Sequence, residues 1–215
     1  MSTNEYLKQL RSDFSKQSLS EDDIDHNPFT QFNNWLKEAT ESNVLEPIAT
    51  TISTVSKYGQ PSSRVVYIRD IQENGFVFYT NYGSKKSHDL EMNPKSCMNL
   101  FWPELERQIR IEGIIEKVDS SISDEYFNDR PKASQIGAWA SQQSQKLASR
   151  AHLEDKVNEL TNQYANKKVP RPENWGGFIL VPHYFEFWQG RKSRLHDRIA
   201  FSKDEDVWKI ERLNP

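Results

Sequence analysis

Residues 96–118 read SCMNLFWPELERQIRIEGIIEKV and contain two runs rich in β-branched and aromatic residues. The first extends from Ser96 to Trp102 and the second from Leu105 to Val118, with Pro103-Glu104 between them as a turn. In the second run polar residues alternate with isoleucines, which gives a strand one polar and one apolar face. We therefore expect two antiparallel strands here.

Runs of the same kind lie on both sides of this stretch, and turns such as Lys57-Tyr58-Gly59-Gln60 and Glu73-Asn74-Gly75 separate several of them. The runs are Pro47 to Val55, Ser62 to Arg69, Phe76 to Asn81, Phe178 to Val181, Tyr184 to Trp188, Arg198 to Ser202 and Val207 to Leu213. Short strands joined by tight turns predict an antiparallel meander or barrel.

Helical patterns flank these strands. Apolar residues recur at three- and four-residue intervals after Asn27-Pro28, where asparagine can cap a helix that starts with proline. Residues 84–92 predict a short helix capped by Ser84, and residues 122–165 are helical in pattern. No boundary or repeat stands out, so we expect residues 28–215 to form a single α+β domain with a β-rich core.

Residues 1–27 are strongly polar and form the remaining part of the chain. Tyr6, Leu7, Leu10 and Phe14 have helical spacing, which predicts a short helix followed by a mobile acidic segment. This N-terminal arm is either a lid or a tail.

The composition excludes several classes of protein. The chain has 215 residues, and 28 basic against 31 acidic side chains do not indicate a general nucleic-acid or membrane-surface protein. Cys97, the only cysteine, is interpreted as a core thiol, and the five histidines lack metal-ligand spacing, so we expect no metal. Without an apolar signal region or a membrane-length apolar run, we expect a cytoplasmic protein with no nucleic-acid or membrane partner.

The predicted helix at residues 84–92 begins with Lys85 and Lys86. Cations are unfavourable at the positive end of a helix dipole unless an anion is bound there, so this start favours a phosphate site. The alternative is a solvated helix face.

A second cationic feature is Glu186-Phe-Trp-Gln-Gly-Arg-Lys-Ser-Arg-Leu-His-Asp-Arg198. In an extended segment Arg194, His196 and Arg198 would share one face, which suits an anion or an electron-rich ring. The alternative is a strand whose arginines pair with carboxylates such as Asp197 or Glu186.

Dinucleotide, Walker, zinc-protease and nucleophile-elbow motifs are absent from the sequence. What remains is a set of basic, hydroxyl and amide side chains that suits two phosphates and a polar heteroaromatic ring. Outside the segment just described, the set consists of Arg64, Arg69, Lys85, Lys86, Arg107, Gln108, Tyr126, Arg130, Ser134, Gln143 and Ser144.

An ordered series of motifs then gives a specific resemblance. The motifs are Phe78-Tyr79-Thr80-Asn81, Gly83-Ser84-Lys85-Lys86, Glu106-Arg107-Gln108, Arg130-Pro131, Ser134-Gln135-Ile136-Gly137-Ala138-Trp139, Trp175-Gly176-Gly177-Phe178, Glu186-Phe187-Trp188-Gln189-Gly190 and Arg194-Leu195-His196-Asp197-Arg198. From about residue 28 to its end, the chain resembles the pyridoxamine 5′-phosphate oxidase family.

The resemblance implies an antiparallel FMN-binding split β-barrel with flanking helices, assembled as a homodimer with FMN at the subunit interface. The residues implied in cofactor binding are Arg64, Lys85 and Lys86 at the phosphate, Tyr79, Thr80, Gln108, Gln143 and Ser144 along the ribityl chain and ring, and Trp188 and Arg198 from the partner subunit. Taken without the resemblance, Trp188 is an ordinary core aromatic and Gln108 belongs to a wet strand face.

The implied activity is the oxidation of pyridoxamine and pyridoxine 5′-phosphates to pyridoxal 5′-phosphate, with hydride transfer to FMN and reoxidation by O2 to hydrogen peroxide. The vitamer phosphate would contact Arg69, Tyr126, Arg130 and Ser134, and the N-terminal Arg11 is a further substrate-binding candidate. Arg194 and His196 are the catalytic candidates; His196 either assists proton transfer or binds an oxygen of the substrate.

Some positions depart from the family pattern or leave alternatives open. Arg69 stands where lysine is common, Lys85 where arginine is common, and Phe14 where a tyrosine can close over the substrate. Arg64 and Arg69 are five positions apart, which fits either two separate phosphates or a strand bulge. Taken alone, Arg130 is a surface cation.

Two other functions compete with the oxidase. One is a related split-barrel flavoprotein, such as a flavin reductase or a haem-degrading homologue. The other is a protein that binds FMN or pyridoxal phosphate without catalysis. The complete Arg194-x-His196-x-Arg198 motif and the Tyr126, Arg130 and Ser134 set favour the oxidase, because the other substrates do not need that second anion pocket.

Overall fold

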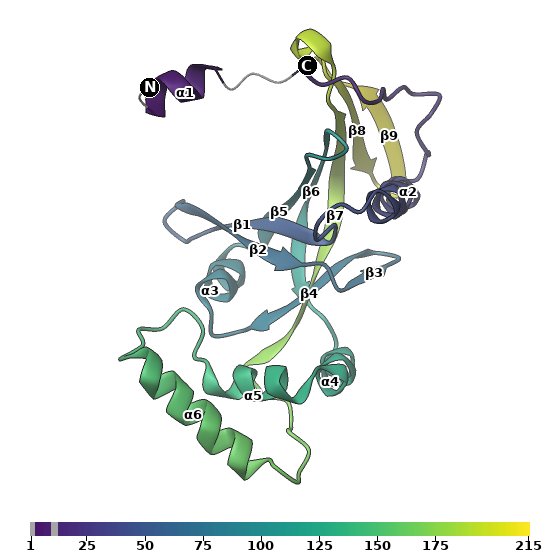
Figure 1. Cartoon of the computed structure of the whole chain (residues 1–215). Helices are drawn as coiled ribbons and strands as arrows, with labels where there is room; N and C mark the ends of the chain where they lie inside the picture. The colour runs from purple at the N-terminus through teal and green to yellow at the C-terminus, as the bar shows by residue number, and fades with distance from the viewer. Residues whose placement is uncertain (1–2, 10–12) are drawn as a thin grey trace. The chain divides into compact units, whose positions relative to one another are not determined.

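The computed structural model describes residues 3–9 and 13–215 (Figure 1). These residues form two compact units, one within Met1–Ile48, Asn99–Ile111 and His183–Pro215, the other from Ala49–Met98 and Glu112–Pro182. Three strands, β5 (Lys95–Trp102), β6 (Arg107–Lys117) and β7 (Trp175–Gln189), contribute residues to both units.

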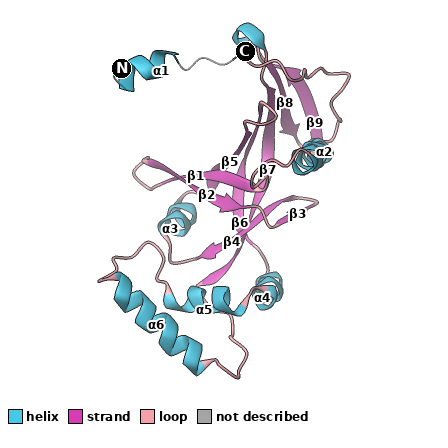
Figure 2. Cartoon of the chain, viewed as in Figure 1, coloured by secondary structure: helices cyan, strands magenta, loops and turns pink. Residues whose placement is uncertain are grey.

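Within the described residues the strands form a nine-stranded sheet in the order β2-β1-β5-β6-β7-β4-β3, with β8 paired to β7 and β9 to β8 (Figure 2). The remaining strands are β1 (Ala49–Val55), β2 (Pro61–Tyr67), β3 (Asp70–Gln72), β4 (Gly75–Asn81), β8 (Asp197–Asp204) and β9 (Val207–Arg212). The strand pairs β1–β2, β3–β4, β4–β7, β7–β8 and β8–β9 are antiparallel. The β-rich α+β prediction is confirmed, and the stretch 96–118 supplies β5 and β6 as expected.

The second unit is built on β4, which is buried over most of its length. Two glycines allow backbones to approach closely there. A Cβ on Gly75 would lie 2.2 Å from the carbonyl oxygen of Leu180, and a Cβ on Gly113 would lie 2.2 Å from that of Val181. Four helices belong to this unit: α3 (Lys85–Met92), α4 (Ser120–Asp129), α5 (Lys132–Ala140) and α6 (Arg150–Gln163).

The first unit has an aromatic core beneath α2 (Pro28–Glu41). Asn27 caps this helix as predicted, because its side chain accepts hydrogen bonds from the backbone N–H groups of Phe29 and Thr30. Trp35 packs edge-on against Phe187 of β7, with ring centroids 5.2 Å apart. The N-terminal segment contains α1 (Thr3–Gln9), and Ser15, Lys16 and Leu19 donate backbone hydrogen bonds to carboxylates of this unit.

The structure differs from three local predictions. The runs 178–181 and 184–188 form one continuous strand, β7. This strand changes partner along its length: its pairing with β4 ends at Leu180 and its pairing with β8 starts at Tyr184. Pro182 lies between these pairings, so its missing N–H removes no bond from either ladder. The sequence pattern missed β3, which has only three residues. Ser84 occupies the N-cap of α3, but its side chain makes no cap hydrogen bond and instead contacts the Ser87 hydroxyl.

Two further observations concern membrane-spanning helices and metal sites. Within residues 3–9 and 13–215, no helix has the length and apolar character needed to cross a membrane. The same part of the chain contains no group of three or more His, Cys, Asp or Glu side chains that could hold a metal ion.

Candidate functional site

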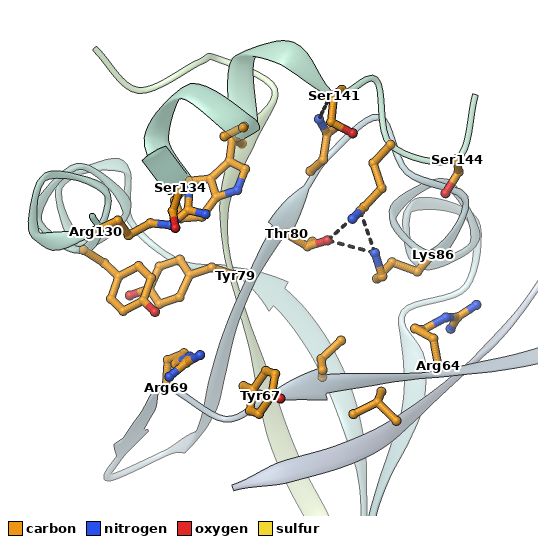
Figure 3. Close-up of a pocket in the computed structure, with 18 of the residues that line it drawn as sticks. Arg64, Tyr67, Arg69, Tyr79, Thr80, Lys86, Arg130, Ser134, Ser141 and Ser144 are labelled. Carbon is orange, nitrogen blue, oxygen red and sulfur yellow. Dashed lines mark hydrogen bonds between the residues drawn. The ribbon is translucent and has the colours of Figure 1, made fainter. Parts of the chain in front are cut away.

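A pocket of about 1120 Å³ lies in the second unit, between the polar ends of β2 and β4 and the helices α3 to α5 (Figure 3). It brings together the candidates that the sequence placed in this unit. They are Arg64, Arg69, Tyr79, Thr80, Lys85, Lys86, Tyr126, Arg130, Ser134, Gln143 and Ser144. Figure 3 shows Arg64, Lys86 and Ser144 on one side of the pocket, and Arg69, Arg130 and Ser134 on the other.

Lys86 is the most buried cation of the pocket, with 8% of its surface exposed. Its ammonium group lies 2.8 Å from Thr80 Oγ1, 2.8 Å from Gln143 Oε1 and 3.2 Å from Ser84 Oγ, all of them neutral. Burial, followed by the charge of Arg64, lowers the pKa of Lys86 to about 8. The solvated-face alternative is therefore wrong for Lys86.

Arg64 lies beside Lys86 and is held by hydroxyl groups. Its Nη1 donates to Thr54 Oγ1 at 2.9 Å and its Nη2 to Ser62 Oγ at 2.7 Å. Burial lowers the pKa of Arg64, and the charge of Asp89 opposes this effect. The register of β1 and β2 is regular through Arg64, so a bulge does not explain the spacing to Arg69. β2 ends at Tyr67, and strand alternation therefore does not govern Arg69.

Asp89 is hydrogen-bonded to several side chains on this cationic side of the pocket. It is buried, and it accepts hydrogen bonds from Thr54 at 2.9 Å, Lys85 at 2.8 Å and Ser62 at 3.3 Å. Burial alone would raise the pKa of Asp89, but the hydrogen bonds from Lys85, Thr54 and Ser62 outweigh it and hold the pKa below its usual value. Asp89 pairs with Lys85 and affects Arg64, whereas the hydrogen-bond partners of Lys86 are neutral. This side of the pocket therefore has an excess of positive charge that suits a phosphate dianion.

An aromatic column forms the opposite side of the pocket. The rings of Tyr79 and Tyr126 stack with centroids 3.8 Å apart, and Trp175 lies parallel to Tyr79 at 5.5 Å. Burial is the main cause that raises the pKa of Tyr79 to about 12, so its hydroxyl stays protonated at neutral pH. The column supplies a flat aromatic wall on the side of the pocket where Arg69 and Arg130 lie (Figure 3).

Arg130 lies over the face of the Trp175 ring. Its guanidinium carbon is 4.5 Å from the centre of the Trp175 ring. Its Nη1 is buried and has no hydrogen-bond partner within the described part of the chain. Burial lowers the pKa of Arg130, and Arg69 adds to this effect while Tyr126 opposes it. A buried, unpaired guanidinium donor is costly unless an anion satisfies it, so this side of the pocket also fits a phosphate.

Five other candidates, Gln108, Trp188, Arg194, His196 and Arg198, belong to the first unit. Gln108 is half-buried on β6. Arg11 lies outside the described residues. The predicted common face of Arg194, His196 and Arg198 is wrong, because Lys192–Arg194 form a 3₁₀ turn in which Ser193 and Arg194 have φ values of 56° and 60°. Strand β8 begins only at Asp197, so strand alternation does not apply before it.

His196 is fixed by this turn. Its Nδ1 accepts a hydrogen bond from the backbone N–H of Arg191 at 3.1 Å, and its ring lies 4.6 Å from that of Trp188 and 5.7 Å from that of Phe14. Burial, followed by the positive charge of Arg194, lowers the pKa of His196. The hydrogen-bond network therefore assigns a neutral imidazole whose Nε2–H is left as a donor. The Arg194 side chain is exposed.

Arg198 pairs with a carboxylate, as the alternative interpretation of its segment predicted. Its Nε and Nη2 donate to the two oxygens of Glu186 at 2.9 and 3.1 Å, and its Nη1 donates to the carbonyl oxygen of Asn214 at 2.9 Å. The hydrogen bond with Glu186 is the main cause that raises the pKa of Arg198. Glu186 is 2% exposed and also accepts from Arg110 at 2.8 Å.

Residue-by-residue reading of the sequence missed two side chains of this arrangement, Asp89 and Trp175. Trp175 stands in the Trp175-Gly176-Gly177-Phe178 motif, which was the available signal for it. No local pattern marked Asp89, since its role depends on contacts with β1 and β2.

An antiparallel sheet with a pocket that has two cationic sides and an aromatic wall defines a binding protein or enzyme for an anionic, ring-containing ligand. The family model described as pyridoxamine 5′-phosphate oxidase matches residues 36–164, and the pyridoxine 5′-phosphate oxidase C-terminal dimerisation region matches residues 175–215. The chain belongs to the pyridoxamine 5′-phosphate oxidase family, a family of oxidoreductases.

Individual proteins agree with this assignment. A pyridoxine/pyridoxamine 5′-phosphate oxidase from Cytophaga hutchinsonii is 49% identical, and the match covers 100% of both chains. The crystal structure of PhzG from Burkholderia lata, in complex with tetrahydrophenazine-1-carboxylic acid, is 32% identical with a TM-score of 0.88 and covers 94% of this chain and 100% of PhzG. An FMN-binding protein from Nostoc punctiforme shares the fold at 17% identity, with a TM-score of 0.69 over 88% of this chain and 98% of its own. The predicted split-barrel fold is thereby confirmed.

Proposed function

We propose that the protein is an FMN-dependent oxidase that converts pyridoxamine 5′-phosphate and pyridoxine 5′-phosphate to pyridoxal 5′-phosphate. The observation that supports this most is the pocket with two separate sites for anions. Lys86 is buried among neutral partners on one side, and Arg130 holds an unpaired Nη1 on the other. A flavin phosphate and a vitamer phosphate would each satisfy one of these groups.

The residues present fit FMN. Arg64, Lys85 and Lys86 would hold its phosphate. Thr80, Gln143 and Ser144 offer hydroxyl and amide groups along the same side of the pocket, and Tyr79 lies in the aromatic wall. FMN, when bound, supplies a two-electron acceptor that molecular oxygen reoxidises with formation of hydrogen peroxide.

This chain's own residues bind and orient the substrate. Arg69, Tyr126, Arg130 and Ser134 line the side of the pocket where the vitamer phosphate would lie. His196 presents an Nε2–H donor because its Nδ1 is occupied, which favours hydrogen bonding to a substrate oxygen over removal of a proton. Orientation of a bound substrate lowers a barrier by roughly 7–11 kcal/mol when it is complete, so placement is the main contribution expected of these residues.

The proposal includes a homodimer with FMN at the subunit interface. The match to a dimerisation region over residues 175–215 supports the dimer. Gln108 would complete the flavin site together with the partner subunit's Trp188 and the partner subunit's Arg198. Arg11 is kept as a substrate-binding candidate on the N-terminal arm.

One anaerobic experiment tests the function. Pyridoxine 5′-phosphate is added to the yellow holoprotein without oxygen, and the flavin absorbance is followed. We expect the absorbance to bleach and to return when oxygen is admitted. A flavin reductase or a haem-degrading homologue would not bleach with this substrate, and a non-catalytic binding protein would bind the vitamer without any change in flavin redox state.

A second candidate rests on the similarity to PhzG. Its bound ligand, tetrahydrophenazine-1-carboxylic acid, is a partly reduced ring system with a carboxylate. Oxidation of such a ring would need the flavin but no second phosphate. Adding this compound in the same anaerobic assay separates the candidates: faster bleaching with it than with pyridoxine 5′-phosphate would favour the phenazine-type activity.

We expect Arg194→Ala to lower turnover roughly tenfold, since it removes one cationic contact to the substrate. FMN content should stay near normal, measured by absorbance of the purified protein. Lys192→Ala is the matched control, because Lys192 is an exposed cation in the same 3₁₀ turn. Equal loss of turnover in both variants, or loss of FMN in Arg194→Ala, would contradict this role.

A further inference from the structure

We propose that Trp175 is a positioning residue that presents the Arg130 guanidinium to the phosphate of the substrate. This inference rests on the proposed function and adds to it a residue to which the family motif alone gave no role. Aromatic rings contact the Arg130 guanidinium on its faces, whereas Nη1 at its edge has no hydrogen-bond partner among the described residues.

The Arg130 guanidinium is held by aromatic faces. Its central carbon lies 4.5 Å from the Trp175 ring centre and 5.6 Å from that of Phe127. Burial is the main cause that lowers the pKa of Arg130, Tyr126 opposes it and Arg69 adds to it, and neither of these two groups is a carboxylate. Its Nη1 is buried without a hydrogen-bond partner in the described structure.

Contact with an aromatic face, in place of a carboxylate, leaves the N–H donors of Arg130 available. A carboxylate partner would occupy the in-plane N–H donors of the guanidinium and neutralise its charge, as Glu186 does for Arg198. An indole contacts the guanidinium plane by cation–π attraction and leaves the edge donors and the charge free. Arg130 is thus ordered before the anion arrives, and it can meet a phosphate without first breaking a salt bridge.

Trp175 is itself rigidly placed. It is 6% exposed, it is the first residue of β7, and it pairs with Asn81 of β4. Its backbone N–H donates to the Pro172 carbonyl at 3.0 Å, and its carbonyl accepts from Arg171 Nη1 at 2.7 Å. The indole is also parallel to the Tyr79 ring within 6°.

The Arg130 backbone is fixed as well. Arg130 is the C-cap of α4, with φ −70° and ψ 146°, and Pro131 follows it. The extended conformation is the one that a following proline favours. Gln135 of α5 supports this corner by donating to the carbonyl oxygens of Phe127 at 2.8 Å and Asn128 at 3.2 Å. The remaining freedom lies in the Arg130 side chain, and the Trp175 face restricts it.

The test compares Trp175→Leu and Trp175→Phe in the FMN-loaded protein. We expect Trp175→Leu to raise the KM for pyridoxine 5′-phosphate roughly tenfold, with kcat changed by less than about twofold. Trp175→Phe should keep most of the affinity because it retains an aromatic face. Unphosphorylated pyridoxine should show the same kcat/KM in all three proteins, since the proposed effect acts only through the phosphate.

A double-mutant cycle with Arg130→Gln separates positioning from a general structural effect. Trp175→Leu should add little to the loss already caused by Arg130→Gln. A full additional loss, an unchanged KM in Trp175→Leu, or equal defects in the Leu and Phe variants would overturn the proposal. If Trp175→Leu does not fold, Trp175→Met takes its place in the same measurements, because methionine also lacks an aromatic face, and an unchanged KM in that variant would overturn the proposal.

Direct titration with pyridoxal 5′-phosphate, followed by its absorbance, keeps this inference distinct from the proposed oxidase activity. If the wild type binds pyridoxal 5′-phosphate and Trp175→Leu binds it about tenfold more weakly, the positioning role stands even when no turnover is found. If the wild type does not bind it, or if both bind equally, the positioning role is wrong.

Discussion

Lys86→Met is expected to weaken FMN binding roughly 100-fold, because a buried charge-assisted hydrogen bond contributes about 1.5–3 kcal/mol. Methionine keeps most of the unbranched apolar chain and removes the terminal ammonium group with its charge and donors. The measurement is titration of the apoprotein with FMN, followed by quenching of flavin fluorescence. Lys85→Met is the matched control, since the Lys85 side chain is 54% exposed and already paired with Asp89. Its effect should be about tenfold or less.

Lys86 should make apoprotein stability and FMN affinity depend on pH in opposite directions. The folded apoprotein holds the pKa of Lys86 at about 8, below the ordinary lysine value of 10.5. Between these values the unfolded chain binds more protons, so the contribution of Lys86 to apoprotein stability rises with pH. A phosphate prefers the charged ammonium, so FMN affinity should fall as pH rises above about 8.

Lys86→Met should remove both trends. Urea unfolding of the apoprotein and FMN titration, each between about pH 7 and pH 10, measure them. An affinity that stays constant through this range in the wild type would show that Lys86 does not meet the phosphate. A slope that is preserved in Lys86→Met would assign the titration to another group.

Local patterns predicted the strands and helices well where burial alternates along one element. In β6 buried residues alternate with half-buried ones from Arg107 to Ile115, as the sequence indicated for residues 105–118. The ordered motifs also named most residues of the pocket before the fold was known. The alternation depends on neighbouring residues and the assignment of pocket residues depends on the order of the motifs, so both can be recognised in a single sequence.

Predictions failed where tertiary contacts override the local pattern. The segment before β8 was read as a strand, but the turn from Arg191 to His196 closes on itself through the hydrogen bond from Arg191 N–H to His196 Nδ1. Positive φ values at Ser193 and Arg194 are uncommon outside glycine, and nothing in the residue types signals them. Asp89 was missed for a similar reason, because its partners Thr54 and Ser62 are distant in sequence.

Arg107 shows why charge alone does not identify a binding residue. The sequence placed it with Arg130 in a set of side chains that suits two phosphates and a polar heteroaromatic ring. In the structure Arg107 is 5% exposed, its Nε donates to Gln189 Oε1 at 3.0 Å, and its Nη1 donates to Glu38 Oε2 at 2.8 Å. Its Nη2 donates to Gln17, and its guanidinium stacks 4.3 Å from the Trp35 ring centre. The three guanidinium nitrogens of Arg107 are engaged, whereas Nη1 of Arg130 has no partner in the part of the chain that the structure describes.

This difference predicts opposite phenotypes. Arg107→Met should lower the free energy of unfolding by about 3 kcal/mol, because it leaves buried acceptors such as Gln189 unpaired. Urea unfolding of the apoprotein measures the change, and Glu38→Gln is the control. Glu38 is 45% exposed, so its loss of charge should cost about 1 kcal/mol or less. Arg130→Gln should change stability little, because it removes a buried charge whose Nη1 has no partner among the described residues. It should abolish tight phosphate binding, because it removes the guanidinium charge. A stable Arg107→Met that binds phosphorylated vitamers poorly would reverse the assignment of the two arginines.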